Sequence, residues 1–156
     1  MLRILIVCTG NTCRSPMTEA LLQRKVKENN LTEIIRVLSA GIAAGADSPA
    51  SDGAVHAMGL RNIDLSAHRS RQLLFEYIEA SDLILTMTER HKRAVLQLAP
   101  QAGAKVFTLA EYAGETVDIA DPFGGSHARY EACARQIEDL VNKIWEKIVD
   151  LAGKKS

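Results

Sequence analysis

Apolar residues follow two patterns that alternate along the chain. Short continuous apolar runs predict strands that are covered on both faces, as in a parallel sheet. Longer stretches with apolar residues three and four positions apart predict amphipathic helices. This alternation predicts an α/β fold, a three-layer sandwich with a central four-stranded parallel sheet and helices on both faces. The expected strands are residues 2–8, 34–39, 83–87 and 105–109, and the expected helices are residues 16–28, 50–58, 70–79, 89–98 and 130–151.

Local signals indicate where some of these elements begin and end. Thr88 is a typical N-cap for the helix that follows it, and Pro16 suits a first helical turn. Gly153 is expected to close the last helix. Residues 110–126 form the longest segment without a periodic pattern. In a compact domain such a loop is often functional.

Composition and charge restrict the class of protein. The 156 residues are expected to form a single domain, residues 1–156, and 47% hydrophobic with 24% charged residues is typical of globular proteins. Because 19 basic residues balance 19 acidic ones, no overall charge favours nucleic acid or a membrane surface. Three cysteines, and an apolar start too short for a signal peptide or a membrane span, predict a reduced, cytoplasmic protein. We expect it to be a monomer.

The segment with the most chemical information is CTGNTCRSP, residues 8–16, between the first expected strand and the first expected helix. This is the edge at which open α/β sheets bind ligands. A turn of this length can direct backbone N–H groups at an anion, and the helix N-terminus adds positive charge there. Gly10 and Asn11 are residue types that tolerate the positive φ angles such a turn needs.

Cys8, at the base of this turn, is the candidate nucleophile. The amide dipoles and Arg14 both favour a thiolate over a thiol. Arg14 can hold two phosphoryl oxygens in a planar fork, which places phosphorus in line with the sulfur. Ser15 can donate a hydrogen bond to the thiolate and ease its departure when an intermediate breaks down.

Two other interpretations of this segment are weaker. A cysteine followed six positions later by an arginine arises by chance about once in twenty cysteines, but the strand, the Gly-Asn pair, the serine and the helix around it argue against coincidence. A metal site is disfavoured, because Cys8 and Cys13 lack the close spacing of zinc ligands and no histidine lies nearby in the sequence. We therefore expect neither a metal nor another cofactor.

Asp121 is the candidate acid, because a leaving group needs a proton as its bond to phosphorus breaks. It begins the segment DPFGG, residues 121–125, within the long loop. Pro122 restricts Asp121 to an extended conformation, which can hold the carboxylate away from its own backbone and direct it into the pocket. The alternative from residue type alone is an ordinary turn-forming Asp-Pro pair.

With CTGNTCRSP near the N-terminus and DPFGG from residue 121, the sequence resembles the low-molecular-weight protein tyrosine phosphatase family over essentially its whole length. Segments 39–41, 64–71 and 82–87 also resemble the family pattern. The resemblance implies a reaction in two steps, in which Cys8 attacks phosphorus to form a phosphocysteine while Asp121 protonates the leaving group. Asp121 then activates the water that hydrolyses this intermediate.

The resemblance also implies supporting roles around the loop. Asn11 would fix the loop through hydrogen bonds to Ser39 and His68, which position the site without taking part in the chemistry. Cys13 would be a neighbouring thiol that forms a disulfide with an oxidised Cys8 before irreversible oxidation. Its alternative is a small buried apolar residue. The residues expected to surround the substrate are Thr9, Gly10, Asn11, Thr12, Cys13, Ser15 and Phe123.

Thr12 and the residues after Pro122 decide the expected substrate. Eukaryotic members commonly carry a bulkier aliphatic residue in place of Thr12 and further aromatic residues in place of Gly124 and Gly125. Thr12 and the glycines leave a polar, narrower opening suited to a planar guanidinium, which Asp121 would both bind and protonate. In this the sequence is similar to the bacterial protein-arginine phosphatases of the family. That resemblance implies phosphoarginine in proteins as substrate, phosphate as product and inhibitor, and an opposing protein-arginine kinase, and the alternative substrate is phosphotyrosine.

Two other classes of protein stay as weaker alternatives. An arsenate reductase on the same scaffold would need further thiols near the third strand, where residues 81–90 contain no cysteine. A phosphate-binding module without activity would lack the nucleophile or the acid, whereas Cys8 and Asp121 are both present. Cys133 is expected in the core, and the remaining histidines are expected at the surface or on helix faces: His56, His91 and His127.

Overall fold

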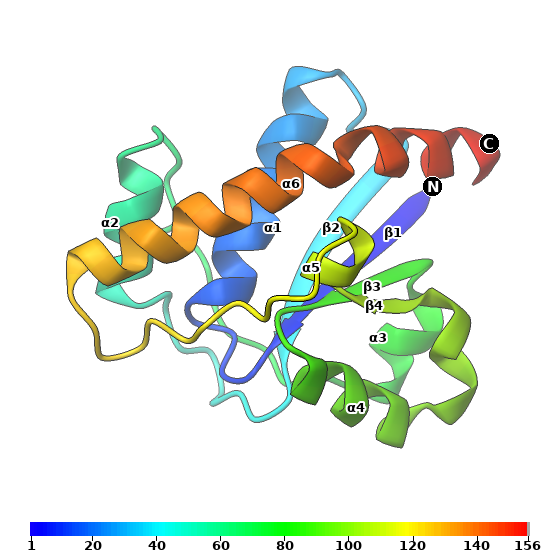
Figure 1. The fold of residues 1–156 in the computed structure, drawn as a ribbon, viewed down its shortest axis with the longest axis horizontal. Coiled ribbons are helices and arrows are strands. Elements are labelled where there is room, and N and C mark those ends of the chain that lie inside the picture. The colour runs from blue at the N-terminus through cyan, green and yellow to red at the C-terminus, as the bar shows by residue number, and fades with distance from the viewer. Residues whose placement is uncertain (156) are drawn as a thin grey trace.

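Four parallel strands form the centre of the computed structural model, which describes residues 1–155 (Figure 1). They run in the order β2-β1-β3-β4, and each neighbouring pair is parallel. The predicted three-layer α/β sandwich with a central four-stranded sheet is confirmed. Because the strand order reverses beside β1, the crevice that binds ligands in such sheets lies at the end of that strand. The strands are β1 (Leu2–Cys8), β2 (Ile35–Gly41), β3 (Leu83–Thr86) and β4 (Val106–Thr108).

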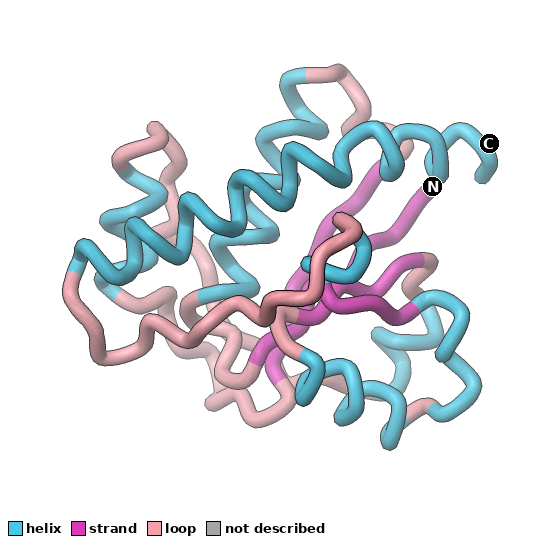
Figure 2. The backbone as a smooth tube through the Cα atoms, in the orientation of Figure 1, coloured by secondary structure: helices cyan, strands magenta, loops and turns pink. Residues whose placement is uncertain are grey.

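Helices cover both faces of this sheet (Figure 2). On β1, Ile4 and Ile6 belong to the larger core cluster with α1, α2 and α6, whereas Leu5 and Val7 belong to the smaller cluster with α3 and α4. Both faces of β1 are therefore apolar, which explains the continuous apolar run at the N-terminus. The helices are α1 (Arg14–Glu28), α2 (Asp52–Gly59), α3 (Phe75–Ala80), α4 (Glu89–Leu98), α5 (Leu109–Tyr112) and α6 (His127–Lys155), with a 3₁₀ helix at Pro100–Lys105.

Two helix boundaries near the site differ from the prediction. Helix α1 begins at Arg14, before Pro16, so the arginine belongs to the first turn of the helix. The helix predicted from residue 70 begins only at Phe75, because residues 70–74 run extended along the sheet edge. There Gln72 forms a parallel bridge with Gly41, the last residue of β2, and the Leu73 N–H donates to the Gly41 carbonyl at 2.8 Å.

Of the predicted helix ends, the N-cap of α4 is confirmed and the end of the last helix is wrong. Thr88 is the N-cap of α4, and its hydroxyl accepts a hydrogen bond from the His91 N–H at 3.2 Å, as expected. Gly153 does not close the last helix, which continues to Lys155. The loop predicted from residue 110 begins with the short helix α5, whose capping box pairs Thr108 with Glu111.

Candidate active site

The loop between β1 and α1 turns at a single residue. Asn11 has a φ of 58°, whereas Gly10 is not among the residues with positive φ in the described chain, where only Gly114 and Gly124 are such glycines. Of the two residues noted for their tolerance of positive φ, only Asn11 adopts it. One left-handed residue is enough to bring the chain from the strand into the helix, and asparagine is a residue type that adopts this conformation.

The side chain of Asn11, which is fully buried, holds the loop in place. Its Nδ2 donates to Ser15 Oγ at 2.8 Å and to Ser39 Oγ at 2.9 Å. Its Oδ1 accepts from the Arg71 N–H at 2.9 Å, and its backbone oxygen lies 2.7 Å from His68 Nε2. The contacts to Ser39 and His68 that the family resemblance implies are present. Four contacts from one residue fix the shape of the loop.

A chain of hydrogen bonds runs from helix α1 to the candidate nucleophile. The buried Ser39 hydroxyl donates to the Glu19 carboxylate, and Ser39 also accepts from Asn11. Asn11 donates to Ser15 as well, and Ser15 Oγ lies 2.8 Å from Cys8 Sγ. Burial raises the pKa of Glu19, although the hydrogen bond from Ser39 opposes this. The position of the Cys8 sulfur is thus determined by side chains on β2 and α1.

Arg14 is buried and fixed by the loop that carries the candidate acid. Its Nη1 donates to the Ile119 carbonyl at 2.9 Å, and its Nη2 lies 3.5 Å from Thr9 Oγ1. The same Nη2 is 3.6 Å from Asp121 Oδ2. Arg14 Nε is buried and has no hydrogen-bond partner among residues 1–155. A buried donor of this kind is available for an oxygen of a bound anion.

Asp121 lies at the mouth of the site, with about half of its side chain exposed. Its Oδ2 faces Arg14, as the expectation required, but its Oδ1 accepts a hydrogen bond from the Phe123 N–H at 3.0 Å. The expectation that Pro122 keeps the carboxylate away from its own backbone was therefore wrong for one of the two oxygens. This contact is an Asx turn, in which an aspartate oxygen accepts from the N–H two residues later in the chain. One carboxylate oxygen of Asp121 therefore belongs to the turn, and the other faces the pocket.

A cavity of about 200 Å³ brings most of the predicted site residues together. Asn11, Ser15, Ser39 and His68 do not line it and lie behind the loop, where they support its shape. Phe123 is 71% exposed at the rim, so it offers one face to a ligand without a second ring opposite. The residues that line the cavity are Cys8, Thr9, Gly10, Thr12, Cys13, Arg14, Asp121 and Phe123.

Cys13 lines the cavity and has two hydroxyl groups as neighbours. Its Sγ lies 3.2 Å from Ser51 Oγ and 3.4 Å from the Tyr130 hydroxyl. Burial and the contact with Cys13 raise the pKa of Tyr130 to about 12. Cys133 is buried on α6, where burial raises its pKa to about 12, and its place in the core agrees with the prediction.

His91 is a site residue that the sequence analysis missed. It lies on a helix face, one of the two places expected, but it is 1% exposed, and its Nε2 lies 2.8 Å from Thr9 Oγ1. Burial, with a smaller contribution from the Arg14 charge, lowers its pKa to about 4. Its position one helical turn before the buried Val95 is the signal in the sequence that places it on the inner face of α4. His56 and His127 are exposed and stack on each other, with ring centroids 4.1 Å apart.

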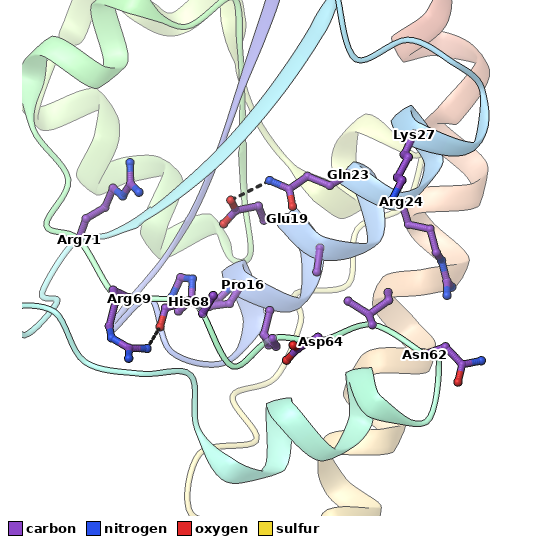
Figure 3. Close-up of a pocket in the computed structure, with 14 residues that line it drawn as sticks. Pro16, Glu19, Gln23, Arg24, Lys27, Asn62, Asp64, His68, Arg69 and Arg71 are labelled. Carbon is purple, nitrogen blue, oxygen red and sulfur yellow. Dashed lines mark hydrogen bonds between the residues drawn. The ribbon is translucent and has the colours of Figure 1, made fainter.

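A larger groove of about 570 Å³ runs along α1, on the far side of the loop (Figure 3). None of the residues that line it is a cysteine or a serine, so it holds no nucleophile of the predicted kind. It supplies support to the site: Glu19, which Figure 3 shows in contact with Gln23, begins the hydrogen-bond chain to Cys8. His68 and Arg71, which also line the groove, contact Asn11. The phosphoryl chemistry therefore belongs to the smaller cavity.

Residues 1–155 contain no group of three His, Cys, Asp or Glu side chains placed to hold a metal ion. Within the same residues, no helix combines the length and the apolar character that a membrane span requires.

Known proteins resemble this chain over nearly its whole length. The sequence model of the family described as low molecular weight phosphotyrosine protein phosphatase matches residues 3–152. A protein-arginine-phosphatase of Geobacillus stearothermophilus is 43% identical over 147 residues, which cover 94% of this chain and 95% of the relative. A protein-arginine-phosphatase of Bacillus subtilis (strain 168) is 39% identical over 93% of this chain and 95% of its own length.

A solved structure of the YwlE arginine phosphatase, a mutant with a phosphorylated active-site serine, superimposes with a TM-score of 0.89. It is 38% identical in sequence, and the match covers 94% of this chain and 95% of that one. Family match, sequence identity and fold agree with the loop geometry described above. The chain belongs to the low molecular weight phosphotyrosine protein phosphatase family.

Proposed function

We propose that the chain is a protein-arginine phosphatase, which hydrolyses phosphoarginine in proteins through a phosphocysteine. The observation that carries this proposal is the single cavity that Cys8, Arg14, Thr12 and Asp121 line together. It offers a sulfur nucleophile, a cation for the phosphoryl oxygens, a small polar wall and a carboxyl group at the mouth. The two protein-arginine-phosphatases at 43% and 39% identity support the same substrate class.

In the first step the Cys8 thiolate attacks phosphorus, so that an S–P bond forms as the P–N bond to the substrate guanidinium breaks. Asp121, in its acid form, gives its proton to the departing nitrogen. Arg14 and the loop N–H groups hold the phosphoryl oxygens through the transition state. Arg14 is suited to this role because the Ile119 carbonyl fixes Nη1 while Nε keeps an unused hydrogen.

In the second step water attacks the phosphocysteine, and an O–P bond forms as the S–P bond breaks. Asp121, now a carboxylate, accepts a proton from the water, and inorganic phosphate leaves. The sulfur departs as a thiolate, which Ser15 stabilises from 2.8 Å. Cys8 and Asp121 therefore take part in both steps from the same cavity.

Guanidinium selectivity is proposed to come from Thr12 and from the carboxylate of Asp121. Phe123 is the one aromatic residue among those that line the cavity, and a single exposed ring cannot enclose a phenyl group between two faces. A planar guanidinium instead donates charge-assisted hydrogen bonds to the carboxyl oxygens of Asp121. Phosphotyrosine is the second candidate substrate, because the family as a whole is described by that activity.

The test compares kcat/KM of the purified protein on phosphoarginine and phosphotyrosine peptides of one sequence. We expect a preference for phosphoarginine, which Thr12→Ile reduces by about tenfold to a hundredfold, the range for one altered pocket contact. A native preference for phosphotyrosine of an order of magnitude would refute the arginine assignment.

Mass spectrometry of the Asp121→Ala variant during turnover tests the chemistry separately. With an activated aryl phosphate as substrate, whose leaving group needs no proton, only the second step is slowed, so phosphate on Cys8 is expected to accumulate. Cys8→Ala is the control without a nucleophile. Absence of any phosphocysteine would favour a phosphate-binding module instead. An arsenate assay with added thiols and no turnover would exclude the reductase.

The setting of the activity is also part of the proposal. The substrates are phosphorylated proteins, made by an opposing protein-arginine kinase, and released phosphate inhibits by occupying the same cavity. The proposed state is a cytoplasmic monomer, with no nucleic acid or membrane partner and no cofactor, in which Cys13 protects an oxidised Cys8 by forming a disulfide. Light scattering, phosphate inhibition and peptide mapping after peroxide treatment test these statements one by one.

A further inference from the structure

His91 is a buried polar side chain that the proposed reaction does not use. It lies on α4, and its Nε2 contacts the hydroxyl of Thr9, a residue of the cavity wall, at 2.8 Å. Its other ring nitrogen, Nδ1, is buried and has no hydrogen-bond partner within residues 1–155. The ring therefore makes a single side-chain hydrogen bond in this part of the chain, and that bond is directed at the site.

The imidazole is neutral near pH 7. Its burial disfavours the charged form, and the positive charges of Arg14 and Arg90 act in the same direction, while Asp118 and Asp121 oppose them. A neutral imidazole has one N–H and one lone pair. The contact with Thr9 can therefore run in either of two directions.

The two directions leave different atoms without a partner. If Thr9 donates to Nε2, the ring proton sits on Nδ1, and a buried N–H has no acceptor. If Nε2 donates to Thr9, only a lone pair on Nδ1 is unused. Orphaned buried N–H groups are rarer in proteins than under-used acceptors, which favours the proton on Nε2.

This direction determines what Thr9 can do. A hydroxyl has two acceptor sites and one proton. Thr9 Oγ1 then accepts from His91 Nε2 and, over 3.5 Å, from Arg14 Nη2. With both acceptor sites engaged, its proton is left for a group in the cavity that Thr9 lines.

We propose that His91 is a positioning residue that holds Thr9 as a hydrogen-bond donor to a phosphoryl oxygen. The inference deepens the proposed function and rests on it for the natural substrate. The recognised chemistry is any phosphate-sized tetrahedral oxyanion, so inorganic phosphate serves as the probe. His91 touches neither the phosphoryl group nor the sulfur in this role and acts through Thr9.

The first test reads the ring proton in the unmodified full-length protein. Long-range ¹H–¹⁵N spectra at pH 7 with saturating inorganic phosphate distinguish the two neutral forms of a histidine. The Nε2–H form of His91 is expected. The Nδ1–H form would overturn the proposal, because the Thr9 hydroxyl would then donate to His91 Nε2 and have no proton for the phosphate.

The second test measures binding of inorganic phosphate through the amide shifts of residues 9–14. Thr9→Val is expected to weaken binding by about tenfold or more, as for a lost hydrogen bond to a charged group, and Thr9→Ser to retain it. His91→Phe is expected to weaken binding several-fold in the native background and to add nothing to Thr9→Val. His56→Phe, at an exposed histidine outside the cavity, is the matched control and leaves binding unchanged.

Equal losses from His91→Phe with and without Thr9→Val would overturn the proposal, since the histidine would then act by another route. His91→Gln, which keeps an N–H donor, is expected to recover part of the affinity. If these results hold but phosphoarginine is not hydrolysed, the proposed function fails while the role of His91 stands.

Discussion

Replacement of Asn11 tests how much the loop depends on one side chain. Asn11→Ala removes three side-chain hydrogen bonds, to Ser15, Ser39 and the Arg71 N–H. At about 1 kcal/mol each, their loss lowers the free energy of unfolding by about 3 kcal/mol. Alanine at a φ of 58° adds about 1 to 2 kcal/mol of backbone strain. The total of about 4 to 5 kcal/mol is a large part of the stability of an ordinary domain.

Asn11→Gly separates the two contributions, because glycine adopts positive φ without strain. It is expected to lose only the hydrogen bonds, about 3 kcal/mol in equilibrium urea unfolding. Asn62 provides the matched control, since it is exposed and has a φ of 61°. There alanine is expected to be less stable than glycine by the same margin of about 1 to 2 kcal/mol, without the larger loss. An Asn11→Gly protein as stable as the native one would refute the reasoning.

Three further predictions concern stability in urea unfolding. Gly53→Ala places a methyl group 2.2 Å from the Tyr130 ring and is expected to cost about 1 to 3 kcal/mol, and a neutral effect would contradict it. Arg61→Ala removes two hydrogen bonds of 2.8 Å to Glu131, one of 3.3 Å to Glu138 and one of 2.9 Å to the Ala57 carbonyl. The expected loss is about 2 to 4 kcal/mol, and the part from the carboxylates shrinks in high salt. Because the pKa of His91 falls from 6.5 to about 4 in the folded protein, the unfolded chain binds its proton first as the pH drops. Above pH 6.5 the imidazole is neutral in both states and the shift has no effect, whereas between pH 6.5 and 4 protonation of the unfolded chain is expected to lower the free energy of unfolding by about 3 kcal/mol. His91→Gln should remove this pH dependence.

The architecture was predictable because the apolar pattern of the chain reflects burial directly. Residues 2–8 are apolar throughout since both faces of β1 are covered, and the last helix repeats its apolar positions along the core. Short elements were less predictable. Helix α5 depends on a capping box, and residues 70–74 are held extended by pairing with β2, which is a tertiary contact that no local pattern carries.

The part of the candidate site that lies within one short segment could be predicted from the sequence. Cys8 to Ser15 are adjacent in sequence, and Asp121 could be found because its Pro-Phe-Gly-Gly context resembles a known family. His91 was missed because it approaches Thr9 across a sequence separation of 82 residues. A histidine has the same helix propensity and the same charge whether it faces the solvent or the core. The residues around His91 therefore give no sign of a distant partner such as Thr9.

The order in which the parts of the site are made has a consequence for the newly synthesised protein. Cys8, Ser15 and Ser39 are made by residue 41, whereas His68 and Arg71, which also hold Asn11, follow later. The Ile119 carbonyl, Asp121 and the helix that packs on α1 come last. As a chain leaves the ribosome, its N-terminal part emerges first, whereas a single domain generally folds as a unit. A nascent chain can therefore present the thiol before it has the acid, and the complete site is available only after Asp121 and the helix that packs on α1 have been made.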